Sequence, residues 1–566
     1  MKFTVLSHAG LAVDHGGVRL VFDPWLIGSC YWRSWWNYPE PDPALVRNLA
    51  PQYIYLTHLH WDHFHGPSLK KLFDPTTTVL VPKAPTRRMV DDLRWLGFHN
   101  IVEISHGQKL RLADDFEMRS YQFGLGIDSA AVISGGGYTL FNCNDCKFFG
   151  LPLRQILRNH RTIDFIFRSH SSASPIPLCI EDHEKLLPRD DGSYDSADQF
   201  ARCAIYSGAR YAIPFASNHC FLHPETRHFN STVTTPELAK SRYRAIAAEV
   251  GVKTECVVMP PSSSWSDTEG FKISPFDFSQ RESHIGKLLE RNGSKLAVQC
   301  ALEAKAVGDF PAFEKYFTQF CRSLPWLIRR RRLPALTFRV RDCAGAHHWL
   351  VDPRLGEVTR VAAPPPNALI FEVHAAVLND CANSRMFSVW TASKRLKIHL
   401  PSAEALGAAT LWFNLLDLYE IGLLPIINNF SLRSLAVRLR RWREPVEVAN
   451  ILLRRIFLRR RFSVSRIYPV EELSPRQRTV ARGDALEGEA AAVFLARRNQ
   501  SRSQGAGAHE RQKPGTSRVH GLRVDQQGSA LSGDSSHRLQ VTGEHRASND
   551  LSFKEGHPKT LAGRRK

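Results

Sequence analysis

Four histidines and one aspartate crowd into the eight residues that begin at His58, and this cluster constrains the fold more than any other stretch. The apolar run directly before it, residues 53–56, has the length and composition of a buried strand. Because side chains alternate along an extended chain, His58, His60 and Asp62 would lie on one side and His63 on the other. The sequence therefore predicts a metal-binding loop at the end of a strand.

The ligand types narrow the choice of metal. Neutral imidazoles and carboxylates suit zinc or iron, and a loop at the end of a strand leaves room for the open coordination position of a catalytic ion. A helix-like segment, residues 67–72, follows the loop, whereas a surface loop that is merely rich in histidine would not need this context. We therefore expect zinc, as one or two ions, with iron as the alternative.

The spacing H-x-H-x-D-H from His58 to His63 resembles the signature of the metallo-β-lactamase superfamily. The resemblance implies an α/β protein with the αββα sandwich of that superfamily. Strand-like and helix-like segments do alternate after the motif, with residues 78–82 and 101–104 as strands and residues 86–96 as a helix.

The resemblance also implies ligands outside the motif. The strand-like residues 138–141 lead to Asp145, which matches the carboxylate that can bridge two metals in the superfamily. A later strand, residues 210–215, leads to His219 as the last ligand, with His223 as the second choice. The implied metal ligands are His58, His60, Asp62, His63, Asp145 and His219.

One ligand of the superfamily does not appear. A histidine is expected between the motif and the bridging aspartate, but the chain offers Gln122 there, while His106 comes too early and His170 comes later. The departure weakens the first metal site and leaves open which of these three residues replaces the histidine.

The first residues form a hairpin pattern, with strands at 3–6 and 18–22. His8 and Asp23 match a His-Ala pair and an Asp-Pro pair of lactonase-type and phospholipase-type relatives. The resemblance implies that both lie near the metal, where they support ligands or face the substrate. A buried polar pair that only supports the strands is the alternative.

Six large aromatic residues follow between residues 25 and 38. We expect four of them to wall a substrate pocket, and the alternative is that they only pack on their own domain. The four predicted substrate-binding residues are Trp25, Trp32, Trp35 and Trp36.

Four stretches sharpen the resemblance, at residues 23–26, 35–39, 213–217 and 258–261. Together they are similar to the metallo-β-lactamase-like part of CMP-N-acetylneuraminate hydroxylase and its bacterial relatives. That family carries a Rieske iron–sulfur domain bound by C-x-H and C-x-x-H pairs, and no C-x-H pair occurs in this sequence. We expect the Rieske domain to be absent, so an oxygenase would need a separate Rieske protein as electron donor.

The pattern divides the chain into five parts. Residues 1–270 are expected to form the metallo-β-lactamase-like domain, 271–335 a helical connector, 336–405 a smaller α/β domain, 406–470 a helical arginine-rich segment and 471–566 a disordered basic tail.

The net charge of +20 comes almost wholly from the later parts, since residues 1–250 hold 26 Lys and Arg against 25 Asp and Glu. Arginines and apolar residues interleave between residues 431 and 463, which is typical of a helix on an anionic membrane surface or of a solvated basic face. Nucleic acid is not the expected partner. Eleven cysteines without regular spacing and no signal-like leader indicate a cytoplasmic protein, with a peripheral membrane location left open.

These observations lead to three functional hypotheses. The first is a hydrolase of a small-molecule ester, lactone or phosphodiester, in which Asp62 and His8 are catalytic. The second is an iron-dependent oxygenase of a nucleotide-sugar-like substrate. The third is a non-catalytic metal-binding module that docks to a membrane.

Overall fold

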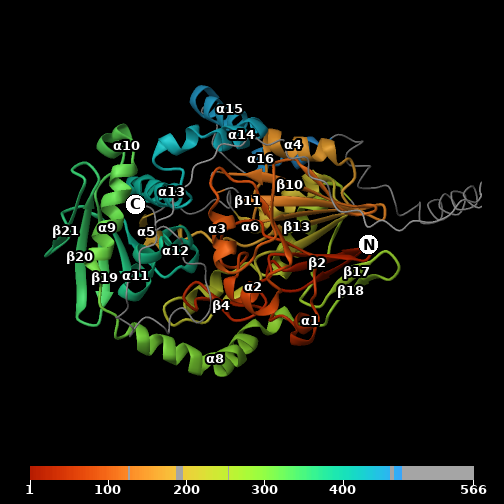
Figure 1. Cartoon of the computed structure of the whole chain (residues 1–566), viewed down its shortest axis with the longest axis horizontal. Coiled ribbons are helices and arrows are strands. Elements are labelled where there is room, and N and C mark those ends of the chain that lie inside the picture. The colour runs from red at the N-terminus through yellow and green to blue at the C-terminus, as the bar shows by residue number, and fades with distance from the viewer. Residues whose placement is uncertain (125, 127, 187–194, 253, 459–463, 474–566) are drawn as a thin grey trace, which may run out of the picture. The chain divides into compact units, whose positions relative to one another are not determined.

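The computed structural model describes residues 1–124, 126, 128–186, 195–252, 254–458 and 464–473. Within these residues, two large β-sheets face each other across a hydrophobic core (Figure 1). In spatial order, the first sheet contains β18 (Gly270–Lys272), β17 (Ser264–Ser266), β1 (Lys2–Val5), β2 (Leu11–His15), β3 (Val18–Phe22), β6 (Tyr53–Tyr55), β7 (Thr78–Pro82) and β8 (Ile101–Ile104). The second contains β16 (Glu255–Cys256), β14 (Tyr211–Phe215), β13 (Phe165–Ser169), β12 (Tyr138–Asn144), β11 (Asp128–Gly135), β10 (Phe116–Phe123) and β9 (Lys109–Ala113).

Alternate side chains of both sheets build the core between them. Phe3 of β1 meets Phe165 of β13 edge to face, with ring centroids 5.0 Å apart, and Trp265 of β17 stacks on Phe3 at 5.6 Å. Because side chains alternate along a strand, each sheet also presents apolar residues on its outer face, and these must be covered.

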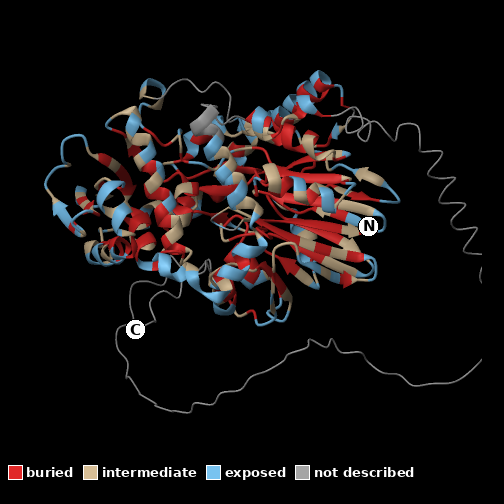
Figure 2. Ribbon diagram, turned by 90° about the horizontal axis from the view of Figure 1, so that it is seen from above, coloured by how far each residue is buried: buried red, intermediate tan, exposed pale blue. Residues whose placement is uncertain are grey.

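Helices cover both outer faces. α2 (Gly66–Leu72) and α3 (Arg88–Trp95) pack on the first sheet, where Leu69 and Leu93 join Ile54 and Val79 in one buried cluster. α4 (Gly150–Asn159), α6 (Ser196–Ser207) and α7 (Pro236–Val250) contribute to the cluster on the second sheet. Figure 2 shows the buried strands in the interior and the exposed residues on the elements around them. This order of layers confirms the predicted αββα sandwich.

A second, smaller α/β unit follows α8 (Arg281–Glu303). Its sheet contains β21 (Glu357–Val361), β20 (Gly345–Asp352), β19 (Leu336–Asp342), β22 (Leu369–His374) and β23 (Lys397–His399) in spatial order. The helices that share its core are α9 (Phe310–Ser323), α11 (Ala375–Ser384), α12 (Phe387–Ser393) and α13 (Leu406–Glu420). The described residues of both units fall into one compact body.

The arginine-rich segment forms η4 (Ile426–Phe430), α14 (Leu432–Arg440) and α15 (Arg443–Leu458) and returns to the sandwich. Arg433 pairs with Glu103 of β8, and Figure 1 places α14 and α15 beside α4. In the part of the chain that the structure describes, no helix combines the length and the apolar character needed to cross a membrane. From residue 474 on, the predicted tail lies outside the described residues.

Candidate metal centre

Hydrogen bonds at both ends hold the motif loop. Asp23 follows β3 and Thr57 follows β6, and these two strands are parallel neighbours in the first sheet. Thr57 donates to the Asp23 carboxylate from its backbone N at 2.8 Å and from Oγ1 at 2.7 Å. At the other end, the His65 side chain caps α2 by accepting a hydrogen bond from the backbone N of Ser68. These hydrogen bonds therefore fix the position of both ends of the motif loop.

Asp23 also fixes the orientation of His63. Nδ1 of His63 lies 2.8 Å from Oδ2 of Asp23, and the side-chain amide of Asn144 donates to the same oxygen. With Nδ1 held in this way, Nε2 of His63 points into the site, 3.3 Å from Oδ2 of Asp62 and 3.4 Å from Oδ2 of Asp145. A carboxylate behind an imidazole is the usual support of a metal-binding histidine.

Potential ligand atoms converge in two overlapping groups of three. His8, Asp62 and His63 form one group, His58, His63 and Asp145 form the other, and the ligand atoms of each group lie within 4.8 Å of one another. Two ligands of one tetrahedral zinc ion, each about 2.1 Å from it, are about 3.4 Å apart. The separations of His63 from both carboxylates match this value, so the donors could close on one ion with little movement.

Buried ring nitrogens without hydrogen bonds give a second test of whether a metal fits. Among the described residues, neither ring nitrogen of His8 has a hydrogen-bond partner, although Nε2 lies 3.0 Å from Oδ2 of Asp62. Nε2 of His63 and Nδ1 of His219 also lack one. A buried polar atom without a partner is costly, and a metal ion would bind the one lone pair that each neutral imidazole can offer. The donor set therefore fits zinc or iron.

The electrostatics of the site favour a cation. Burial alone would raise the pKa of Asp62, but the charge of His63, whose Nε2 lies 3.3 Å away, holds that pKa well below its usual range. Burial would also raise the pKa of Asp145, but the close approach and charge of His63 lower it. Burial and the nearby charges of His63 and His60 lower the pKa of His58, which keeps this imidazole neutral and able to bind a metal.

Two predicted ligands lie beside these groups rather than within them. Nδ1 of His60 lies 2.8 Å from Nε2 of His58, on the less buried side of the site. The ring of His219 stacks on Trp35 with centroids 3.6 Å apart, and its centroid lies 5.6 Å from that of His8. The second choice, His223, contacts Glu303 at 3.2 Å and so belongs to another network.

The three residues considered for the missing ligand have different surroundings. The side-chain amide of Gln122 donates to the backbone O of Ile104, and its backbone N donates to Nδ1 of His106. His170 is buried, and its pKa is lowered to about 3 by burial and by the nearby charge of His8. The charges of His8 and Asp145 therefore act on His170, whereas the charges that act on His106 are those of arginines such as Arg441.

Sequence reasoning missed two residues of the site. Asp128, at the start of β11, feels the charges of His60, His63 and Asp145, while burial raises its pKa. Tyr31 donates a hydrogen bond of 2.5 Å to Oδ1 of Asp62. No local sequence pattern indicated Asp128, and Tyr31 belongs to the aromatic run at residues 25–38 but was not among the four residues predicted from it.

The four predicted aromatic residues separate into two sets. Trp25 lies beside His8, with ring centroids 5.5 Å apart, and Trp35 stacks on His219, so both wall the inner side of the site. Trp32 packs on Trp61 and donates from Nε1 to Asp380 of the second α/β unit. Trp36 belongs to a different buried cluster and does not face the metal centre.

Two facing sheets, helices on both outer faces and a histidine- and aspartate-bearing loop at the end of a strand give the chain a metallo-β-lactamase fold. No model of a known protein family matches the chain. A solved isothiocyanate hydrolase from gut bacteria of Delia radicum is 15% identical and covers 47% of this chain and 99% of its own, with a TM-score of 0.34.

Curated proteins with sequence similarity confirm the predicted resemblance over part of the chain. The chain is 29% identical over 248 residues to a Mycobacterium tuberculosis protein whose name describes it as a Rieske 2Fe-2S iron-sulfur protein, covering 42% of this chain and 47% of that one. It is also 29% identical over 152 residues to the cytidine monophosphate-N-acetylneuraminic acid hydroxylase of Mus musculus, 26% of each protein. The matched region spans less than half the length of either relative.

Proposed function

We propose that the protein is a metal-dependent hydrolase that acts on an ester, lactone or phosphodiester of a small molecule. The observation that carries this proposal is the convergence of imidazole nitrogens and carboxylates around Nε2 of His63. A buried set of this kind supports metal binding by His58, His63, Asp62 and Asp145, with His8, His60 and His219 as neighbours. Zinc is the expected ion, and iron is the alternative.

A bound zinc ion would lower the pKa of a water molecule and polarise the carbonyl or phosphoryl group under attack. Asp62 can accept the proton of that water, because its lowered pKa keeps it ionised at neutral pH. Tyr31 donates to one oxygen of this carboxylate and His8 lies against the other, so both hold its orientation. The water oxygen would then bond to the carbon or phosphorus, and the departing alcohol would take the proton.

The substrate would approach from the side of Asp145 and His60. The side chain of Asp145 is 25% exposed, whereas those of His63 and His8 are fully buried or nearly so. Trp25 and Trp35 close the opposite side against water. Among the described residues of the site, the more exposed side is therefore the side of Asp145 and His60.

An iron-dependent oxygenase is the second candidate, and the similarity to the mouse hydroxylase and to the Rieske-named mycobacterial protein favours it. Histidines with carboxylates suit a non-haem iron ion. Such an enzyme would act on a nucleotide-sugar-like substrate and would take its electrons from a separate Rieske protein.

Turnover with and without oxygen distinguishes the two candidates. The protein would be stripped with a chelator, reloaded with zinc or iron, and tested on nitrophenyl esters and phosphodiesters with and without oxygen and reductant. Zinc-dependent turnover that needs neither oxygen nor reductant, and that is lost in Asp62→Asn and His63→Ala but kept in His99→Ala, supports the hydrolase; His99 is exposed and outside the site. A strict need for iron, oxygen and reductant would overturn it, and inertness with a bound metal would leave a non-catalytic metal-binding module.

A further inference from the structure

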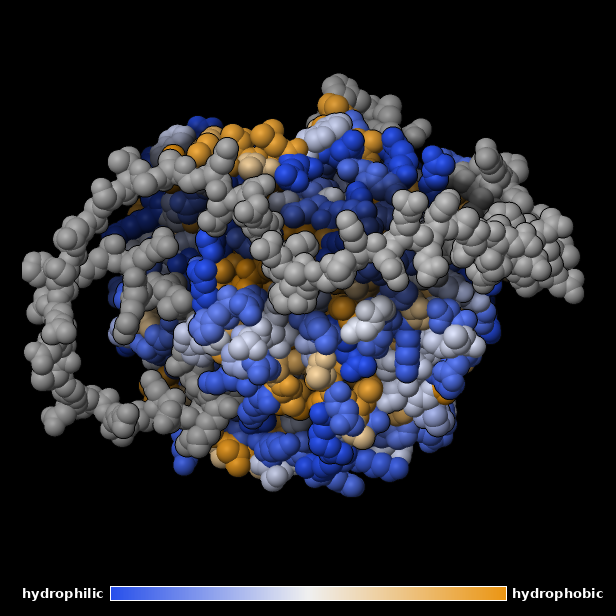
Figure 3. All heavy atoms as spheres, turned by 45° about the vertical axis from the view of Figure 1, so that its right-hand side comes forward, coloured by the Kyte–Doolittle hydropathy of each residue, from blue (hydrophilic) through white to orange (hydrophobic). Residues whose placement is uncertain are grey.

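An exposed apolar surface runs along η4, α14 and the start of α15. The exposed fraction is 87% for Leu432, 75% for Phe430 and 71% for Ile427, which is unusual for large apolar side chains. Figure 3 shows hydrophobic residues gathered at the upper edge of the molecule with hydrophilic ones beside them, where Figure 1 places α14 and α15. We call this surface the arginine-rich face and define its apolar part by Ile427, Phe430, Leu432, Leu435, Leu439 and Trp442.

The amphipathic pattern of α14 shows that this exposure is built in. Leu432, Leu435 and Leu439 are exposed, whereas Ser434 and Val437 on the other side of the helix are buried against the protein. The helix therefore packs against the rest of the protein through Ser434 and Val437, and its leucines face solvent.

The charged residues of η4, α14 and α15 are also divided between the two sides, with the acidic ones facing the protein and arginines facing solvent. Its two acidic residues point inward, because Glu444 accepts from the backbone N of Gly124 at 2.9 Å and Glu447 accepts from that of Leu151 at 3.0 Å. Residues 426–443 contain no acidic residue, and Arg438 and Arg440 are exposed beside the apolar side chains. The outward side thus combines apolar groups with positive charge only.

This combination selects among possible partners. A second copy of the chain would have to pair the face with itself or with another positive surface, and a two-fold contact would bring Arg438 and Arg440 against their own copies. Nucleic acid would leave the aliphatic side chains exposed. An anionic lipid bilayer takes up both parts, since apolar side chains enter the acyl boundary and arginines remain at the headgroups.

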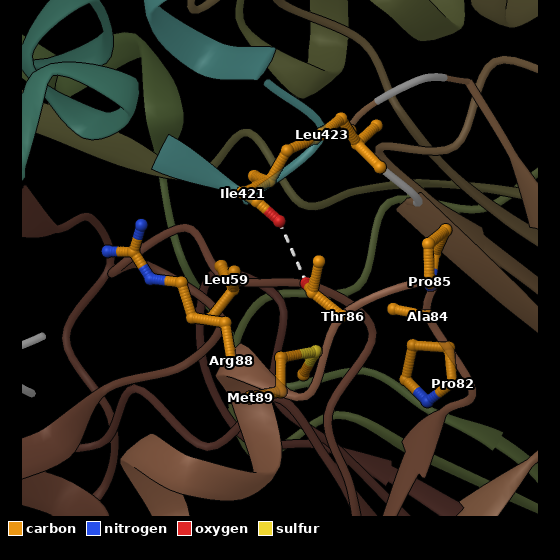
Figure 4. Close-up of a pocket in the computed structure, with 10 residues that line it drawn as sticks. Leu59, Pro82, Ala84, Pro85, Thr86, Arg88, Met89, Ile421 and Leu423 are labelled. Atoms are coloured by element: carbon orange, nitrogen blue, oxygen red, sulfur yellow. Dashed lines mark hydrogen bonds between the residues drawn. The ribbon is translucent and has the colours of Figure 1, made fainter. Parts of the chain in front are cut away.

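The segment that leads into the arginine-rich face passes beside the metal loop. Leu59, which lies between two motif histidines, lines a small pocket together with Thr86 and Ile421, and Oγ1 of Thr86 donates to the backbone O of Ile421 at 2.8 Å (Figure 4). Ile421 lies five residues before η4. A partner bound to the arginine-rich face would therefore lie near the motif loop.

We propose that the arginine-rich face docks the protein on the surface of an anionic lipid bilayer as a peripheral protein. The docking requires apolar insertion by Phe430, Leu432 and Trp442 and attraction of Arg438 and Arg440 to the headgroups. It does not depend on which reaction the metal centre performs.

Co-sedimentation of the full chain with vesicles tests the proposal. Vesicles of phosphatidylcholine with phosphatidylglycerol should bind the protein at least about tenfold more tightly than phosphatidylcholine alone, and high salt should weaken the binding. The variants Phe430→Ser/Leu432→Ser and Arg438→Glu/Arg440→Glu should each reduce binding by about tenfold or more. All four side chains are exposed, so these variants should keep the circular dichroism and melting temperature of the wild type.

Matched controls lie on α7, where Leu238 and Arg244 are also exposed. Leu238→Ser and Arg244→Glu should bind vesicles as the wild type does. Equal binding by the wild type and both double variants would overturn the proposal. A second result would also overturn it: the wild type does not bind vesicles but self-associates in sedimentation velocity, and the double variants abolish this self-association.

Discussion

Lys394 is a buried cation where the second α/β unit packs against the sandwich, and its effect on stability can be predicted. Its side chain is buried, and Nζ lies 5.3 Å from the ring centroid of Phe221 and 5.2 Å from that of Phe229. No side-chain hydrogen bond or ion pair to it occurs among the described residues. Burial lowers its pKa from 10.5 to about 8, although the nearby Cys179 acts in the opposite direction.

The lowered pKa determines both the sign and the size of the contribution of Lys394 to the free energy of unfolding. Below pH 8 the lysine is charged in both the folded and the unfolded protein, so the folded state carries the full cost of the buried charge. A pKa that falls from 10.5 to about 8 corresponds to roughly 3 kcal/mol, and the cation–π contacts offset about 1 kcal/mol of it. Between pH 8 and pH 10.5 the folded state has already lost the proton, so the stability of the wild type rises with pH and the penalty disappears.

We therefore expect Lys394→Met to raise the free energy of unfolding by about 2 kcal/mol at pH 7 and by less than about 1 kcal/mol at pH 10. Urea unfolding followed by tryptophan fluorescence at both pH values measures the difference. Lys315→Met on α9 is the control, because Lys315 is exposed. If Lys394→Met destabilises the protein at pH 7, or changes it equally at both pH values, the lysine is not an unpaired buried charge and the reasoning is refuted.

Three further changes have expected outcomes. Arg395→Met should destabilise the protein by about 3–5 kcal/mol in urea unfolding, because it removes the bidentate partner of the buried Glu303 at 2.6 Å; a loss below about 1 kcal/mol would contradict this. Asp23→Ala should weaken metal binding by about 10–100-fold in a chelator competition, since His63 loses its support, whereas an unchanged affinity would show that Asp23 only holds the strands. Removal of the metal should lower the melting temperature in a thermal scan, and re-addition should restore it, because an ion bound only to the folded state stabilises that state; His63→Ala should abolish both changes.

The motif loop could be predicted from the sequence because its information is local. His58, Asp62 and His63 lie within six residues after a strand, and the strand, the loop and the capped helix each leave a short-range pattern. The alternation of strands and helices predicted a layered α/β domain for the same reason, whereas the αββα sandwich was implied by the resemblance of the motif to the metallo-β-lactamase superfamily. Local patterns do not report which distant segments return to the same edge of a sheet.

Asp128 and Tyr31 illustrate what such patterns lack. Asp128 reaches the site only because β10 and β11 form a long hairpin in register from Phe116 to Asp128, which brings the start of β11 to the motif loop. Tyr31 lies in an irregular segment where Tyr31, Trp32 and Arg33 all have positive φ values of 54–60°. Such backbone conformations are rare outside glycine and have no reliable sequence signature.

The apolar stretch at residues 409–432 shows a different limit. Its sequence predicts a buried or interfacial helix, and α13 indeed buries Trp412 and Leu416, but the chain leaves the core after Leu424 and exposes Phe430. The residues before Leu424 and those after it in this stretch are similarly hydrophobic. Only the contacts reveal that the first part builds a core and the second part faces outward.

The geometry also bears on the number of metal ions. Nε2 of His63 approaches both Asp62 and Asp145, and it is shared by both groups of potential ligands. Since Nδ1 of His63 is held by Asp23, this residue has one lone pair to offer and can complete one group at a time. A second ion would need donors from the less buried side of the site, where His60 and Asp128 lie. We therefore expect elemental analysis to find one ion per chain at low metal concentration, and any second ion to depend on Asp128, so that Asp128→Asn removes the second ion but not the first.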